Sequence, residues 1–213
     1  MTHQRVRTVT TLLTLTLATV VAPDAAAQTR PAVAPSGKGH TAADVQFMRG
    51  MIAHHAQAIV MAAMAPTHGA SAHVGLFARK VMVSQRDEIE LMQGWLEDHA
   101  AAMPDSGESM AHHAMHKDMS ATEHATLMPG MLTTAQLAQL EQARDTTFDR
   151  LFLTFMIQHH EGALAMVATL FDSPGAGQTP EIFGFATGVD ADQRAEIARM
   201  QGMLTTITGR TAK

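Results

Sequence analysis

The sequence predicts an all-α protein, a four-helix bundle made of two repeated helical hairpins, on the basis of two observations. The pattern Met-x-x-His-His-x-x-Ala-x-x-Met occurs at 51–61 and again at 156–166. The segments that follow also match, because 77–96 and 185–204 share Phe-Ala, Gln-Arg, Glu-Ile, Met-Gln-Gly and Leu in the same order. Each copy therefore supplies two long helical segments, which pair as a bundle or in another all-helical order.

Residues 1–27 have the features of a secretory signal peptide. Two arginines precede an apolar run at 9–21, and Ala25–Ala27 forms a small-residue cleavage site. We expect cleavage near Ala27, a mature chain beginning near Gln28, and a periplasmic or secreted protein. The alternative is an uncleaved membrane anchor. No later run reaches the roughly 18 apolar residues of a spanning helix, so we expect no stable membrane insertion.

The composition limits the classes of ligand that the protein can bind. The net charge is −5 at pH 7, which argues against nucleic acid because its binding needs a basic surface. The chain has no cysteine, so any soft metal ligand must be methionine. Methionine numbers 17 and histidine 13, and this abundance makes metal ions the expected partners.

The first hairpin repeat is predicted at residues 41–99. Thr41 followed by Asp44 is a capping signature that starts the first helix. Pro66 ends this helix close to Ala65, and the second helix is expected to run from about Ser71 to the end of the repeat.

The second hairpin repeat is predicted at residues 132–208 and begins with a short helix at about 134–144. A long helix follows at about 146–171, and the Ser-Pro-Gly-rich segment 173–177 forms a turn. Pro180 then occupies the first position of the last helix, where its missing N–H costs nothing.

Residues 28–40 and 100–131 have the composition of linkers. The first is rich in proline, serine and glycine, which predicts a flexible tether. The second interleaves methionine with histidine, a composition typical of metal-binding tracts, although a solvated linker without function is the alternative. We predict additional metal ligands at Met48, on the repeated helix, and at six positions of this linker. The linker positions are Met110, His112, His113, Met115, His116 and Met119.

The repeated helix places adjacent histidines beside methionine on one face. Met51 precedes His54 and His55 by three and four residues, so its sulfur can reach either imidazole. Burying imidazoles between helices costs free energy unless each finds a partner, and few carboxylates occupy that face. A satisfied core histidine is the usual alternative for a single position. For the matched pairs we predict metal ligation by Met51, His54, His55, Met61, Met156, His159, His160 and Met166.

Ligand softness predicts copper as the metal. Thioether and imidazole without thiolate suit Cu(I), imidazole also suits Cu(II), and Ag(I) should bind by the same argument. Zinc sites usually draw on cysteine, histidine and carboxylate. A di-iron centre requires Glu-x-x-His spacing, whereas Leu91 and Arg199 stand three residues after the recurring Glu88 and Glu196.

The repeated positions resemble the signature of the CopM-like family, a bacterial domain of unknown function. The resemblance covers residues 41–208 and implies a ferritin-like helical bundle with copper binding and copper resistance in the periplasm or outside the cell. It implies copper for the methionines and histidines of both copies. The residues that carry it are Asp44, Phe47, Met51, His54, His55, Ala58, Met61, Asp149, Phe152, Met156, His159, His160, Ala163 and Met166.

These observations favour a binding protein over an enzyme. We expect an exported protein that sequesters or shuttles Cu(I) and Cu(II) without catalysis and exchanges metal with a periplasmic copper exporter or chaperone. Two alternatives stay open: a metal-dependent oxidase built on a helical bundle, and a structural helical module whose histidines are incidental. The sequence has no nucleophile triad, phosphate loop or nucleotide-binding fingerprint.

Overall fold

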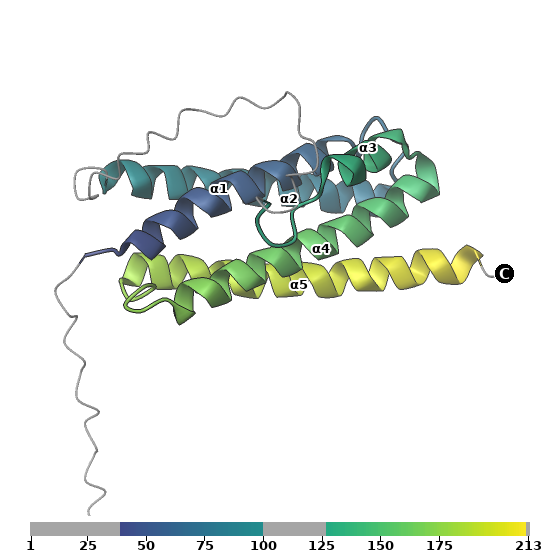
Figure 1. Cartoon of the computed structure of the whole chain (residues 1–213). Coiled ribbons are helices and arrows are strands. Elements are labelled where there is room, and N and C mark those ends of the chain that lie inside the picture. The colour runs from purple at the N-terminus through teal and green to yellow at the C-terminus, as the bar shows by residue number, and fades with distance from the viewer. Residues whose placement is uncertain (1–38, 100–126, 212–213) are drawn as a thin grey trace, which may run out of the picture. The chain divides into compact units, whose positions relative to one another are not determined.

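The computed structural model describes residues 39–99 and 127–211, which are helical and contain no β-strand (Figure 1). The all-α prediction is therefore confirmed. None of the helices in these two ranges has the length and hydropathy that a membrane-spanning segment requires. The predicted signal peptide, nearly all of the tether and most of the linker lie outside the described residues. The helices are α1 (Ala42–Ala63), α2 (Ala72–Asp98), α3 (Thr134–Gln142), α4 (Asp145–Asp172) and α5 (Pro180–Thr211).

The helices pair as the repeat predicts. Helices α1 and α2 form one antiparallel hairpin, and α4 and α5 form the other. Figure 1 shows the two hairpins side by side, with α1 and α4 in contact between them. The short α3 packs against α4. The two copies of the repeated helix thus meet at the centre of a bundle of two hairpins.

Local capping explains where the helices begin. The side chain of Thr41 accepts a hydrogen bond from the Asp44 N–H at 3.2 Å, and the Thr41 N–H donates to the Asp44 carboxylate at 2.6 Å. This is the predicted capping box, in which each residue satisfies a free N–H of the first turn. Thr133 and Gln136 form a second capping box at the start of α3.

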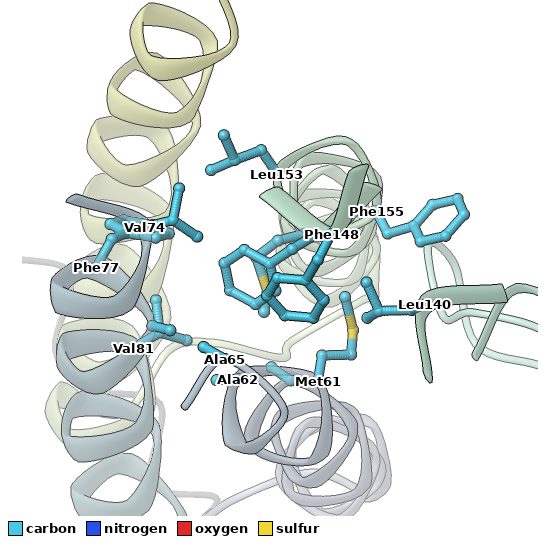
Figure 2. Packing of buried hydrophobic residues seen from close by; sticks show 14 of the residues in the cluster. Met61, Ala62, Ala65, Val74, Phe77, Val81, Leu140, Phe148, Leu153 and Phe155 are labelled. Carbon is cyan, nitrogen blue, oxygen red and sulfur yellow. The ribbon is translucent and has the colours of Figure 1, made fainter. Parts of the chain in front are cut away.

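The buried apolar residues form two cores. One core joins the second half of α1, the first half of α2, α3 and the first half of α4. Figure 2 shows Met61, Val81 and Phe148 pointing into this core from three different helices. The other core joins the first half of α1, the last turns of α2, the second half of α4 and the first half of α5. Because α1 and α4 run antiparallel, the middle of each helix lies between the two cores.

The aspartates that recur in the two copies tie the hairpins together. Asp44 of α1 accepts a hydrogen bond at 2.7 Å from the Gly177 N–H in the α4–α5 turn. Asp149 of α4 accepts one at 3.1 Å from the Ser71 N–H in the α1–α2 turn. Each copy of the repeat therefore satisfies a backbone donor in the other hairpin, which stabilises the packing of α1 against α4.

Candidate metal centre

Four buried histidines lie between the two cores, at the interface of α1 and α4. The side chains of His54, His55, His159 and His160 are at most 1% exposed. The ring centroids of His54 and His159 lie 3.8 Å apart, so the two copies meet through these imidazoles. Within each copy the adjacent rings are separated by 6.5 Å and 6.3 Å. We call these four side chains the histidine layer.

Two members of the histidine layer donate to carboxylates on the outer helices. The Nε2–H of His55 donates to Glu88 of α2 at 2.5 Å, and that of His160 donates to Glu196 of α5 at 2.6 Å. Few carboxylates occupy the face of the repeated helix itself, and these two partners come from the neighbouring helix of each hairpin. The bond fixes the ring, and in a neutral imidazole it leaves the lone pair on Nδ1.

The two central imidazoles have fewer partners. The Nε2–H of His54 donates to the backbone carbonyl of Pro129 at 3.0 Å, whereas neither ring nitrogen of His159 has a hydrogen-bond partner. Burial and, to a lesser extent, repulsion from His55 and His160 outweigh the opposing bond to Pro129 and lower the pKa of His54 from 6.5 to about 4. Burial and the same like-charge repulsion hold the pKa of His159 well below its usual range. Both rings are therefore neutral at pH 7, which is the form that ligates metal.

Buried polar atoms without a hydrogen-bond partner occur in the histidine layer and on the outer helices. The Nδ1 atoms of all four histidines lack a hydrogen-bond partner, and they are fully buried. Gln85 and Gln193, which occupy equivalent positions in the two hairpins, also leave buried amide atoms unpaired. An unsatisfied buried group costs about 1–3 kcal/mol, so the fold keeps these lone pairs at the expense of stability. The unpaired Nδ1 atoms of neutral imidazoles are groups that can ligate a metal ion.

The part of the chain that the structure describes does not bring together the three or more histidine and carboxylate ligands that are typical of zinc sites. In the two described ranges no group of three or more histidine, aspartate or glutamate side chains could hold one ion. The cores on either side of the layer contain methionines, whose thioether sulfur is a donor that soft monovalent ions prefer.

The predicted methionine ligands lie on both sides of the histidine layer. Met61 and Met156 belong to the core on one side, and Met51 and Met166 to the core on the other. Each side therefore has one methionine from each copy. Met166 is half-buried, and the other three are fully buried.

The additional predicted ligands are Met48 on α1 and six residues of the linker. Met48 is buried in the same core as Met51. The remaining candidates fall outside the described residues: Met110, His112, His113, Met115, His116 and Met119.

Sequence reasoning missed the residues that orient the imidazoles. Glu88 and Glu196 were noted only as unsuitable for a di-iron centre, although their recurrence at the same offset in both hairpins was the signal that could have found them. Pro129 acts through its backbone carbonyl, which no side-chain pattern reveals.

Comparison with known proteins places this geometry in a family. Residues 44–204 match the family model described as "Domain of unknown function (DUF305)", and the match includes both histidine pairs. The crystal structure of a DUF305 fragment from Deinococcus radiodurans is 31% identical, with a TM-score of 0.62 over 78% of this chain and 98% of that chain. A DUF305 protein from Streptomyces coelicolor shows the same fold at 24% identity, with a TM-score of 0.62 over 78% and 94% of the two chains.

Structures of CopM are also similar. Its Cu(II)-bound form is 25% identical, with a TM-score of 0.55 over 76% of this chain and 96% of that chain. Its Cu(I)-bound form is 26% identical, with a TM-score of 0.54 over the same shares. A form of CopM with bound silver gives the same TM-score as the Cu(I) form. The comparison with curated proteins gives no match.

Proposed function

The chain belongs to the DUF305 family, and we propose that it is an exported copper-binding protein that sequesters or shuttles Cu(I) and Cu(II) without catalysis. The observation that carries the proposal is the histidine layer. Its buried Nδ1 atoms have no partners, and methionines from both copies lie on either side of it.

The carboxylates of the outer helices support a ligand role for the imidazoles. A metal-binding histidine usually donates its other N–H to a carboxylate or carbonyl, which fixes the ring and increases its basicity. His55 and His160 have carboxylate acceptors, and His54 has a carbonyl acceptor. Bonds of this kind prepare the opposite nitrogen of each ring for an ion. Ser84 donates to the second oxygen of Glu88 at 3.1 Å and so holds that carboxylate in place.

Two arguments support copper over other metals. The donors are imidazole and thioether, which suit Cu(I), and imidazole also suits Cu(II). In addition, the similar protein CopM has structures with Cu(II), Cu(I) and silver bound. We propose copper as the physiological cargo of this chain and Ag(I) as an ion that binds in its place.

The proposal that the protein is exported depends on the N-terminal sequence. The basic start, apolar run and small-residue cleavage site of residues 1–27 support a periplasmic or secreted protein. In that compartment a copper exporter or chaperone is the kind of partner with which the protein exchanges metal.

Anaerobic titration with Cu(I) against a competing chelator tests the proposed function. The double variant His54→Ala/His55→Ala removes two imidazoles and leaves a strong helix former in their place. We expect the variant to bind less Cu(I) while its circular dichroism stays helical. His73→Ala is the matched control, because His73 is an exposed histidine on α2. Unchanged stoichiometry and affinity in the double variant would show that the histidine layer is not the site.

The alternative function, a metal-dependent oxidase, is tested by measuring oxygen consumption. A copper oxidase would consume oxygen when Cu(I) is added in air, at a rate that scales with protein concentration. We expect no protein-dependent consumption beyond that of free Cu(I), since the proposed role is binding alone.

A further inference from the structure

The end of the linker lies against α1. Residues 128–132, which we call the strap, bond to two positions of this helix. The carbonyl of Pro129 accepts from His54, and Leu132 bonds to Gln57 through both its N–H (2.7 Å) and its carbonyl (3.0 Å). His54 and Gln57 are three residues apart, so the strap follows one face of the helix.

The strap also contacts α4 through its backbone. The Gly130 carbonyl accepts from Gln158 at 3.2 Å. A Cβ atom at Gly162 would lie 1.9 Å from the Pro129 carbonyl oxygen, so this close approach requires glycine. The equivalent position in the first copy is Gln57, which bonds to the strap instead of making room for it. The strap thus lies between α1 and α4, above the histidine layer, in one defined position.

Two methionine side chains approach each other over Gly50 of α1, and one of them belongs to Met128, the first residue of the strap. A Cβ atom built on Gly50 would lie 3.2 Å from the sulfur of Met128 and 3.3 Å from the methyl carbon of Met166. The two thioethers therefore converge over this glycine from the strap and from α4. The second copy has Phe155 at the equivalent position, and its ring is buried in the other core. Only the first copy leaves this space open for the two methionines.

Met128 and Met166 lie at a partly exposed position close to the histidine layer, where an ion arriving from solvent would meet them first. Met128 and Met166 are both half-buried, in contrast to the fully buried Met51, so part of each residue is exposed to solvent. Gly50 precedes His54 by four residues, which puts the methionine pair one turn from the histidine layer on the same face of α1. Thioether sulfur takes no proton near neutral pH and prefers soft cations.

We propose that Met128 and Met166 form an outer site for a soft monovalent cation, Cu(I) or Ag(I), next to the histidine layer. The inference rests on the proposed function, because it adds a second position for the same cargo. The strap holds Met128 in place through Pro129 and Gly130, and Gly50 supplies the open space between the two thioethers. An ion held by two sulfur atoms at this partly exposed position can exchange with solvent. An ion held by the buried imidazoles of the histidine layer exchanges more slowly.

The test follows methionine methyl groups in the wild-type protein. The exported protein is labelled with 13C at the methionine ε-methyl groups and titrated with Ag(I), and NMR signals are assigned with Met128→Leu and Met166→Leu. Leucine is close to methionine in volume, so these variants keep the fold. We expect the Met128 and Met166 signals to shift together, and each variant to lose the shift of the other residue. Met64→Leu is the control, because Met64 is half-buried against the other core.

The outcomes separate this inference from the proposed function. If Ag(I) moves the signals of Met51 or Met156 and leaves Met128 and Met166 unchanged, the outer site is wrong and the proposed function stands. If Met128 and Met166 still respond after His54→Ala/His55→Ala, and the variant binds as much Cu(I) as the wild type, the outer site stands and the histidine layer fails. If no methionine signal moves, the outer site is wrong and the methionines only fill space between helices, whereas the histidine layer is still decided by the Cu(I) titration.

Discussion

The imidazoles of His54 and His159 lie with their centroids 3.8 Å apart, where the two copies of the repeated helix meet. Equivalent residues of the two copies thus contact each other, and each copy supplies half of the histidine layer. Neither ring has a complete set of hydrogen bonds, and both have a lowered pKa. The burial of the layer thus depends on both copies, because one hairpin alone would leave its histidines on an open face.

The first prediction is that the histidine layer costs stability in the metal-free protein. His159→Leu removes two unpaired buried nitrogens and fills their place with apolar atoms, so we expect the free energy of unfolding to rise by about 1 kcal/mol. His68→Leu is the matched control. Both ring nitrogens of His68 are bonded, to Thr67 at 2.9 Å and to the Glu141 carbonyl at 2.8 Å, so its replacement should destabilise the protein. Urea unfolding with a chelator present measures both changes, and equal destabilisation by the two variants would contradict the prediction.

The second prediction concerns the pH dependence of stability. The pKa of His54 falls from 6.5 to about 4 on folding. Between these two values the unfolded chain binds more protons at His54 than the folded chain does, so the free energy of unfolding falls as the pH falls through this window. The full difference amounts to about 3 kcal/mol. Above pH about 7 the residue contributes no pH dependence, because its imidazole is neutral in both states.

Urea unfolding of the metal-free protein at several pH values between 4 and 7 checks this expectation. His54→Leu should reduce the slope of the curve without abolishing it, since the variant lacks this imidazole whereas the buried His159 still contributes. A wild-type protein whose stability stays constant over this window would show that the imidazole is not held neutral.

The third prediction is that Glu88 positions His55 for metal. Glu88→Leu removes the acceptor of the His55 Nε2–H, so we expect the affinity for copper to fall by about 10–100-fold, the usual effect of losing such a partner. Glu90→Leu is the control, because Glu90 is exposed on the same helix. In the metal-free protein, 15N NMR of the imidazole should show the proton on Nε2 in the wild type and a mixture of tautomers in Glu88→Leu. An unchanged tautomer with unchanged affinity would argue against a positioning role.

The sequence predicts the helices and the repeat better than it predicts the site. Apolar spacing and the Thr41–Asp44 capping signature depend on residues that are close in the chain, so they can be recognised without the fold. The bonds from His55 to Glu88 and from His54 to the Pro129 carbonyl depend on how separate segments pack. Pro129 indicates only the end of a loop in the sequence, and its carbonyl becomes the acceptor for His54 only once the strap lies between the helices.

The last prediction is that Gly162→Ala displaces the strap. The added Cβ would lie 1.9 Å from the Pro129 carbonyl oxygen and 2.6 Å from the Cα of Gly130, both of them backbone atoms, so the strap must move away. Overpacking of this kind costs about 1–3 kcal/mol, and the move also breaks the bond from His54 to Pro129. Gly202→Ala in α5 is the matched control, because nothing lies within 4 Å of its added Cβ. That variant should stabilise the protein by about 0.5–1 kcal/mol, since alanine is the better helix former. Urea unfolding of the two variants should therefore give changes of opposite sign, and a Gly162→Ala variant as stable as the wild type or more stable would mean that the strap does not hold its position against α4.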